Sequence, residues 1–108
     1  MKWRRTVLEG QSAFSCTKWL ETLKVSPTMW EWRIVTPYNN SPLPCKNFMY
    51  KISGGYYCIR VEHDGKHIGH AFGSNQTECV SQYFSMIETY EIKKNNDLVH
   101  QIFDRKLV

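Results

Sequence analysis

The sequence predicts an α+β domain in which helices cover one face of an antiparallel sheet of three strands, or four if a weaker segment joins it. Three observations predict this class. Apolar and polar residues alternate in short segments in the middle of the chain, Asp64-Gly65 is typical of a tight hairpin, and apolar residues recur at helical spacing after Asn75. With 108 residues we expect one domain, 1–108, with its core at about 12–92.

The first expected element is a helix from Ser12 to Lys24. Four apolar residues share one of its faces: Cys16, Trp19, Leu20 and Leu23. Pro27 marks its end, because a proline disfavours helical geometry in the residue before it. A half-buried strand is expected next, over Trp30–Val35, where apolar residues alternate.

Three further strand segments follow. Phe48–Ile52 is the weaker candidate, and Ser53-Gly54-Gly55 can turn the chain after it. Tyr56–His63 alternates most clearly, and the Asp64-Gly65 turn joins it to its expected partner Lys66–Phe72.

The last part of the chain is expected to be helical. Asn75 and Glu78 resemble a capping box that begins a helix with a wide apolar face. Asn95-Asn96 is expected to break this helix before a shorter terminal helix over about 97–107. The predicted order is therefore helix, strand, weaker strand, strand, strand, helix, helix. We expect the terminal helix to pack on its own domain; packing on a second copy, as a homodimer, is the alternative.

The composition excludes several classes of protein. No run of about 20 apolar residues is present, so we expect no membrane span, and the basic start lacks the apolar region of a secretory signal. The excess of 14 Lys+Arg over 10 Asp+Glu permits an anionic partner. None of the four cysteines shows paired spacing: Cys16, Cys45, Cys58 and Cys79. Reduced thiols in a cytoplasmic or nuclear protein are therefore expected.

No catalytic motif of the common hydrolase, metalloprotease or nucleotide-binding types is present, so we expect neither an enzyme nor a cofactor. His63, His67 and His70 lie around the hairpin, with Cys58 nearby, and such residues can bind a metal. In a regular strand, however, His70 points to the opposite face from His67. We therefore expect polar hairpin residues and no metal.

Basic and aromatic residues together on an exposed sheet suit nucleic acid, since cations meet phosphates and rings stack on bases. The residues predicted to contact nucleic acid are Lys18, Lys46, Lys51, Arg60, Lys66 and Gln76. Four tryptophans exceed what so small a core usually holds, and this predicts a surface for a protein partner. The residues predicted for that surface are Trp30, Trp32 and Tyr56.

Three stretches resemble the double-stranded RNA-binding domain and together cover about 12–92. They are Trp19–Pro27, Tyr57–Lys66, and Gly69-His70-Ala71 leading to a helix that carries Cys79. The resemblance implies non-catalytic binding of duplex RNA, with Lys18, Lys66 and Gln76 on phosphates. The chain departs from this family at Asn75, Gln76 and Thr77, where the family has a lysine-rich clamp. That departure implies, as the alternative, a protein-interaction or dimerisation module on the same fold.

A second stretch, Lys46–Glu78, is similar to the three-stranded DNA-binding domain of phage integrase arm-binding modules and plant AP2-type factors. This similarity implies a sheet in the DNA major groove, with Lys51, Arg60, Glu62 and Lys66 touching bases. Strand pairing distinguishes the two families. Trp30–Val35 lies beside Tyr56–His63 in the RNA-binding order, and Phe48–Ile52 does so in the DNA-binding order. We favour duplex RNA as the ligand.

Overall fold

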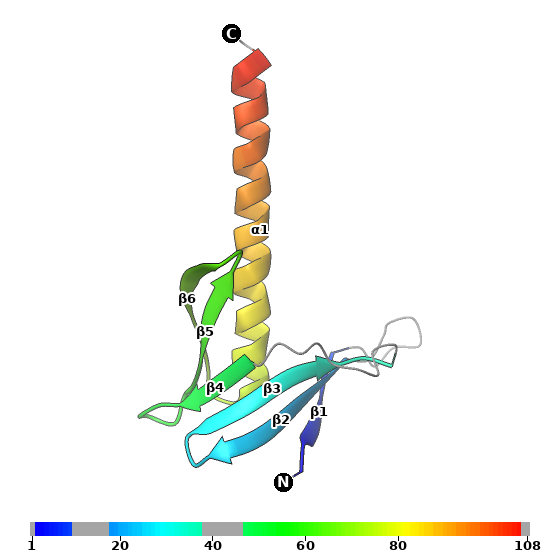
Figure 1. Ribbon diagram of the computed structural model, residues 1–108, viewed down its shortest axis with the longest axis vertical. Coiled ribbons are helices and arrows are strands. Elements are labelled where there is room, and N and C mark those ends of the chain that lie inside the picture. The colour runs from blue at the N-terminus through cyan, green and yellow to red at the C-terminus, as the bar shows by residue number, and fades with distance from the viewer. Residues whose placement is uncertain (1, 10–17, 38–46, 107–108) are drawn as a thin grey trace.

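The computed structural model describes residues 2–9, 18–37 and 47–106. These residues form six strands and one helix: β1 (Arg4–Glu9), β2 (Lys18–Ser26), β3 (Met29–Val35), β4 (Asn47–Lys51), β5 (Tyr57–His63), β6 (Lys66–Gly73) and α1 (Gln76–Lys106). All six strands belong to one antiparallel sheet, and each strand pairs with the next along the chain (Figure 1). The prediction was a sheet of three or four strands, preceded and followed in the sequence by helices. That prediction is wrong.

The largest error concerns the expected helix from Ser12 to Lys24. Residues 18–24 of it lie in strand β2, and residues 12–17 lie outside the described part of the chain. β2 pairs with β1 on one side and β3 on the other. Two complete ladders outweigh the intrinsic helical preference of residues such as Leu20 and Leu23, because that preference is worth only a fraction of a kcal/mol per residue.

β1 has no counterpart among the predicted elements. Its sequence begins with two arginines and ends with a glutamate, so it lacks an apolar face that period-two analysis could detect. It lies at the edge of the sheet, where charged side chains are common because they discourage pairing with other chains.

The four strands predicted from Trp30 onward are confirmed as β3 to β6, with bounds that differ by a residue or so. The hairpin between β5 and β6 is confirmed as well. Asp64 and Gly65 have φ values of 52° and 73°, as a two-residue turn of type I′ requires.

The sheet order places β4 between β3 and β5. Met29 pairs with Tyr50 of β4, and Tyr50 pairs in turn with Cys58 of β5. Residues 30–35 therefore do not lie beside residues 57–63, although the RNA-binding order requires it; residues 47–51 lie there, which is the strand order given for the DNA-binding alternative. The β4–β5 ladder comprises only the Tyr50–Cys58 and Lys51–Tyr57 pairs, so the two halves of the sheet are joined over a short length.

One helix replaces the two that were expected, since Asn95-Asn96 and residues 97–106 of the predicted terminal helix fall within α1, while residue 107 lies outside the described residues. Asparagine is less than 1 kcal/mol worse than alanine inside a helix, and no proline or glycine interrupts this stretch. The start of α1 is as predicted, because the Glu78 N–H donates to Asn75 Oδ1 at 2.8 Å. The far half of the helix extends well beyond the sheet (Figure 1).

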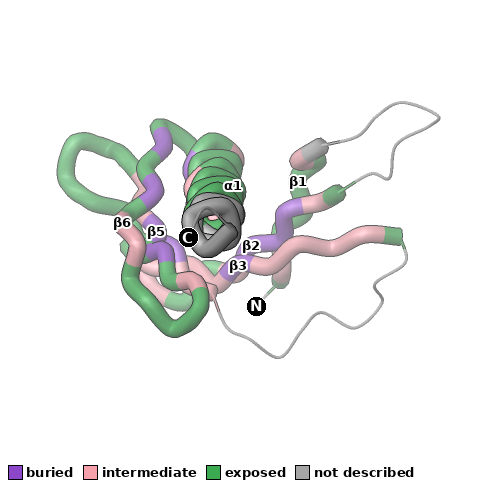
Figure 2. Tube along the Cα trace, turned by 90° about the horizontal axis from the view of Figure 1, so that it is seen from above, coloured by how far each residue is buried: buried purple, intermediate pink, exposed green. Residues whose placement is uncertain are grey.

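The core lies between the helix and the sheet, which curls partly around α1 (Figure 2). Its buried residues come from five strands and the first turns of the helix: Leu20, Trp32, Met49, Ile59, Val61, Ala71, Cys79 and Val80. The Cys79 thiol donates to the Ala71 carbonyl at 3.6 Å, and burial raises its pKa to about 12. This cysteine is therefore a protonated packing residue at neutral pH.

Gly73 determines how closely α1 approaches the sheet. A Cβ at this position would lie 2.3 Å from the Cys79 backbone nitrogen, closer than any real contact. The absence of a side chain thus lets the first turn of the helix rest directly on the end of β6. Nowhere in the described residues is a helical stretch both long and apolar enough to span a membrane.

Candidate nucleic-acid interface

A hollow of about 700 Å³ lies at the start of α1, between the helix and the helix-facing side of β1, β2 and β3. Three cations line it, from two strands and the segment before β1: Lys2, Arg4 and Lys24. Two aromatic rings, of Trp30 and Tyr57, the hydroxyl residues Thr6 and Thr22, and the polar residues 74–77 complete the lining. We call this hollow the basic groove.

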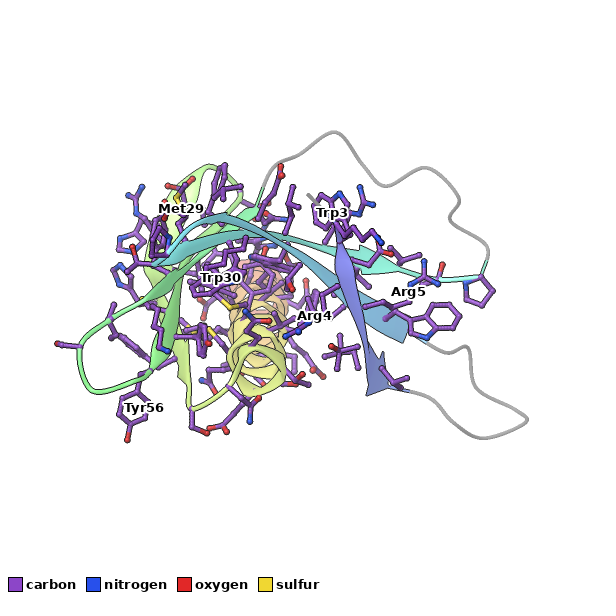
Figure 3. All side chains as sticks on the ribbon, turned by 90° about the horizontal axis from the view of Figure 1, so that it is seen from below. Trp3, Arg4, Arg5, Met29, Trp30 and Tyr56 are labelled. Atoms are coloured by element: carbon purple, nitrogen blue, oxygen red, sulfur yellow. The ribbon has the colours of Figure 1, made fainter. Side chains whose placement is uncertain are left out.

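The alternation of β1 and its register with β2 direct the cations into the basic groove. Arg4 pairs with Thr22, a buried residue whose hydroxyl donates to Gln76 Oε1 at 3.4 Å, so Arg4 shares the helix-facing side. Lys24, two residues after Thr22, faces the same way and pairs with Trp30. Figure 3 shows Arg4 and Trp30 on the helix side of the sheet and Trp3 on the other side.

The two rings form an edge-to-face pair in the wall of the groove. The centroids of Trp30 and Tyr57 are 5.4 Å apart and their planes are inclined by 65°. Lys24 Nζ lies 5.8 Å from the Trp30 ring, and Lys51 Nζ lies 5.8 Å from the Tyr57 ring. Lys51 pairs with Tyr57 across the β4–β5 ladder, which makes it the second cation beside the ring pair.

The electrostatic environment of the groove is positive. It contains the beginning of a helix, where the macrodipole favours negative charge. Glu78, the acidic residue of the first turn, accepts a hydrogen bond from Ser74 Oγ at 2.7 Å and does not line the groove. None of the described lining residues carries a carboxylate, so the basic groove suits an anionic ligand with flat rings.

The opposite face of the sheet uses its cations differently. Glu21, only 7% exposed, accepts hydrogen bonds from Arg5 at 2.9 Å and from Arg33 at 2.8 Å. Each guanidinium also lies against an indole, Arg5 at 5.1 Å from Trp19 and Arg33 at 3.8 Å from Trp3. Because a carboxylate and two rings already occupy them, these arginines hold β1, β2 and β3 together.

The pKa of Glu21 reflects this environment. Burial acts to raise it, but the hydrogen bonds and charges of Arg33 and Arg5 outweigh burial and hold it below the ordinary value of 4.5. The carboxylate is therefore ionised at neutral pH.

Two of the sequence-predicted site residues, Gln76 and Trp30, line the basic groove, and a third, Lys51, lies beside its Tyr57 ring. The others lie elsewhere. Lys18 begins β2, Lys66 follows the hairpin turn, and Arg60 pairs with Glu62 at 2.8 Å on the opposite face of the sheet. Lys46 lies outside the described residues.

The three aromatic residues predicted for a protein partner also separate. Trp32 is 2% exposed and packs against Tyr83, with a centroid distance of 5.1 Å, so it is a core residue and offers no surface to a partner. Tyr56 is 52% exposed at the turn before β5, and Trp30 lies in the basic groove.

Lys2, Arg4, Lys24 and Tyr57 were not among the predicted binding residues. The alternation of Lys2, Arg4 and Thr6 is a pattern that could have identified them, but only once residues 4–9 are known to form a strand. Lys24 was assigned to a helix, which gave it no defined relation to Trp30.

The histidines of the hairpin do not form one cluster. A bulge between Val61 and Glu62 puts His67 and His70 on the same face, with ring centroids 4.9 Å apart, contrary to the expectation for a regular strand. His63 instead contacts Glu91 of α1, and Lys94 Nζ lies 2.7 Å from the neighbouring Asp64. Together these contacts tie α1 to the hairpin.

No known family model, curated protein or solved structure matches this chain. The two family resemblances therefore stay predictions, and the candidate function is argued from the basic groove itself.

Proposed function

We propose that this protein binds nucleic acid through the basic groove, without catalysing a reaction. One observation carries the proposal: Lys2, Arg4 and Lys24 line the same hollow as the Trp30–Tyr57 ring pair at the beginning of a helix, and Lys51 lies beside Tyr57. Cations pair with phosphates and rings stack on bases, so this combination offers both kinds of contact that nucleic acid requires.

The proposal no longer depends on the duplex-RNA arrangement that the sequence favoured. That arrangement places Lys18 on a first helix, and residues 18–26 are a strand. Sheet-mediated DNA binding requires its predicted contact residues to share one face of the sheet. They do not, because Lys51 faces the helix side while Arg60 faces the other side. Support for nucleic-acid binding therefore comes from the groove alone.

A protein-interaction module remains the second candidate, and a specific observation favours it. A second hollow, of about 730 Å³, lies between the far ends of β1 and β3 and the middle of α1. Four apolar residues line it, Leu8, Ile34, Phe84 and Ile87, beside Lys18, Glu88 and two serines, and Phe84 is 42% exposed. A hollow of this kind suits an apolar anchor residue of a partner protein.

The test is a titration of labelled RNA and DNA, single-stranded and duplex, at two salt concentrations. We expect the double variant Arg4→Ala/Lys24→Ala to bind at least tenfold more weakly than the wild type. The slope of log K against log salt should also become shallower by about 1.4–1.8, because two phosphate contacts are lost.

The matched control is Arg60→Ala, which removes one exposed cation from the opposite face. It should change affinity by less than twofold. Absence of binding at low salt, or an equal loss in the control, would contradict the proposal. Salt-insensitive capture of a protein would then favour the second candidate.

A further inference from the structure

We propose that the basic groove takes a single-stranded segment, with one unstacked base lying on the Trp30–Tyr57 ring pair and phosphates on both sides of it. This inference rests on the proposed function and names the form of nucleic acid that the same site accepts.

The recessed position of the rings supports a single strand. Trp30 and Tyr57 are both half-buried in the wall of the groove and do not project from the surface. Inside a duplex, the faces of each base are covered by its neighbours, and proteins reach only the base edges in the grooves. A ring recessed in the wall of a hollow therefore finds a free base face only where the base has left the stack.

The angle between the rings limits the number of bases. Their planes are inclined by 65°, so one flat base can stack on either ring but not on both. The volume of about 700 Å³ lies within the range of pockets that enclose small ligands, and such a pocket accommodates a nucleotide or two but not the side of a double helix.

The cations are placed to hold the backbone on either side of that base. β3, which carries Trp30, lies between β2 with Lys24 and β4 with Lys51. Arg4 and Lys2 extend the basic surface beyond Lys24 toward the edge of the sheet. A nucleic-acid strand that crosses the groove from β4 toward β1 would thus meet Lys51 before the Trp30 ring and Lys24, Arg4 and Lys2 after it, while Tyr57 lies on β5, on the other side of Lys51.

The ammonium groups now over the two rings do not block this arrangement. Both lie 5.8 Å from the ring centroids, at the outer limit of a cation–π contact. Because such contacts are weak at accessible sites and lysine side chains are long, Lys24 and Lys51 can move to neighbouring phosphates when a base occupies the ring face.

The first experiment compares wild-type binding to one sequence as a single strand and as its annealed duplex, in RNA and in DNA. We expect the single strand to bind at least tenfold more tightly. A single strand of equal length whose central nucleotides lack bases should bind about tenfold more weakly than the intact strand, because its phosphates remain and only stacking is lost. These comparisons need no variant and so do not depend on variant folding.

The second experiment removes the ring. Trp30→Leu should weaken single-strand binding about ten- to a hundredfold and leave the salt slope unchanged, since no cation is removed. Trp30→Phe should restore most of the affinity. The matched control is Trp3→Leu, which removes an indole that lies over Arg33 on the opposite face; circular dichroism monitors the fold of each variant.

The possible outcomes distinguish single-strand binding from nucleic-acid binding in general. A duplex that binds as tightly as the single strand, and that the Arg4→Ala/Lys24→Ala variant still weakens, would overturn the single-strand inference and leave nucleic-acid binding standing. Equal affinity for the intact and the baseless strand would also overturn it. If no nucleic acid binds at low salt, both the single-strand inference and the proposed nucleic-acid binding are contradicted.

Discussion

At the scale of single residues, Glu21 shows how one carboxylate can organise a sheet face. It lies on β2 and receives a guanidinium from the strand on each side, so it links three strands through side chains as well as through the backbone. Arg33 is 34% exposed and Glu21 is nearly buried, so these hydrogen bonds are shielded from solvent on one side.

Replacing Glu21 with glutamine should lower the free energy of unfolding at pH 7 by about 1–3 kcal/mol, the usual range for hydrogen bonds to charged groups. The lowered pKa also fixes the pH dependence. Stability from this group is present above its ordinary pKa of 4.5 and is lost as pH falls through the lower folded pKa. Urea unfolding at pH 7 and pH 3 should therefore show a smaller acid-induced loss in E21Q than in the wild type.

Glu62→Gln is the matched control, because the Arg60–Glu62 pair is more than half exposed on both sides. Exposed pairs contribute little, so E62Q should unfold within a few tenths of a kcal/mol of the wild type. Identical pH profiles for E21Q and the wild type would show that the carboxylate does not carry the acid dependence.

Gly73 is the second residue whose identity decides a contact. Gly73→Ala should destabilise the protein by about 1–3 kcal/mol, since the added methyl group meets the backbone of Glu78 and Cys79 and the helix start has to move. Because that helix start lines the basic groove, nucleic-acid affinity should fall as well. Thermal unfolding and a binding titration measure the two effects.

Phe72→Ala provides the comparison within the same strand. Phe72 is 51% exposed on the opposite face, so its truncation should change neither stability nor binding appreciably. Unchanged unfolding of G73A would mean that the helix has room to rise from the sheet without loss.

At the scale of elements, local interactions were predictable, whereas strand β2 was not. The Asn75 cap and the Asp64-Gly65 turn depend on residues adjacent in sequence, and both are present as expected. β2 has neighbours on both sides and partly buried residues on both faces, so its apolar residues do not alternate. Helical spacing in Trp19, Leu20 and Leu23 was therefore misleading.

The long helix depends on a few tertiary contacts along its middle. Glu91 contacts His63, and Lys94 pairs with Asp64 in the hairpin turn. The double variant Glu91→Ala/Lys94→Ala should speed hydrogen exchange in α1 beyond about residue 88 while leaving exchange in β5 unchanged, because exposed ties of this kind hold local structure more than global stability.

Glu88→Ala/Lys93→Ala is the control for that experiment, because it removes the same charges from exposed positions of the same helix. It should leave exchange near residue 91 close to the wild-type rate. Equal acceleration in both double variants would show that helix charge, and not the hairpin contacts, governs the opening.

At the scale of the whole molecule, the two faces of the curled sheet differ in the interactions they make. The helix-facing side holds the core and the basic groove, and the other side holds the Glu21 network. Of the residues that the sequence predicted to bind a ligand, only Gln76 and Trp30 line the groove, with Lys51 beside it. The rest depends on the pairing of β1 with β2, a long-range register that periodicity does not reveal.

Because every strand pairs with the next one along the chain, the sheet can grow hairpin by hairpin, each step closing only a limited loop. The basic groove is different, since it joins residues 2–6 to residues 74–77. A nascent chain still emerging from the ribosome could thus build most of its sheet and yet have no groove until α1 docks. Binding through the groove would then be possible only for the completely folded chain.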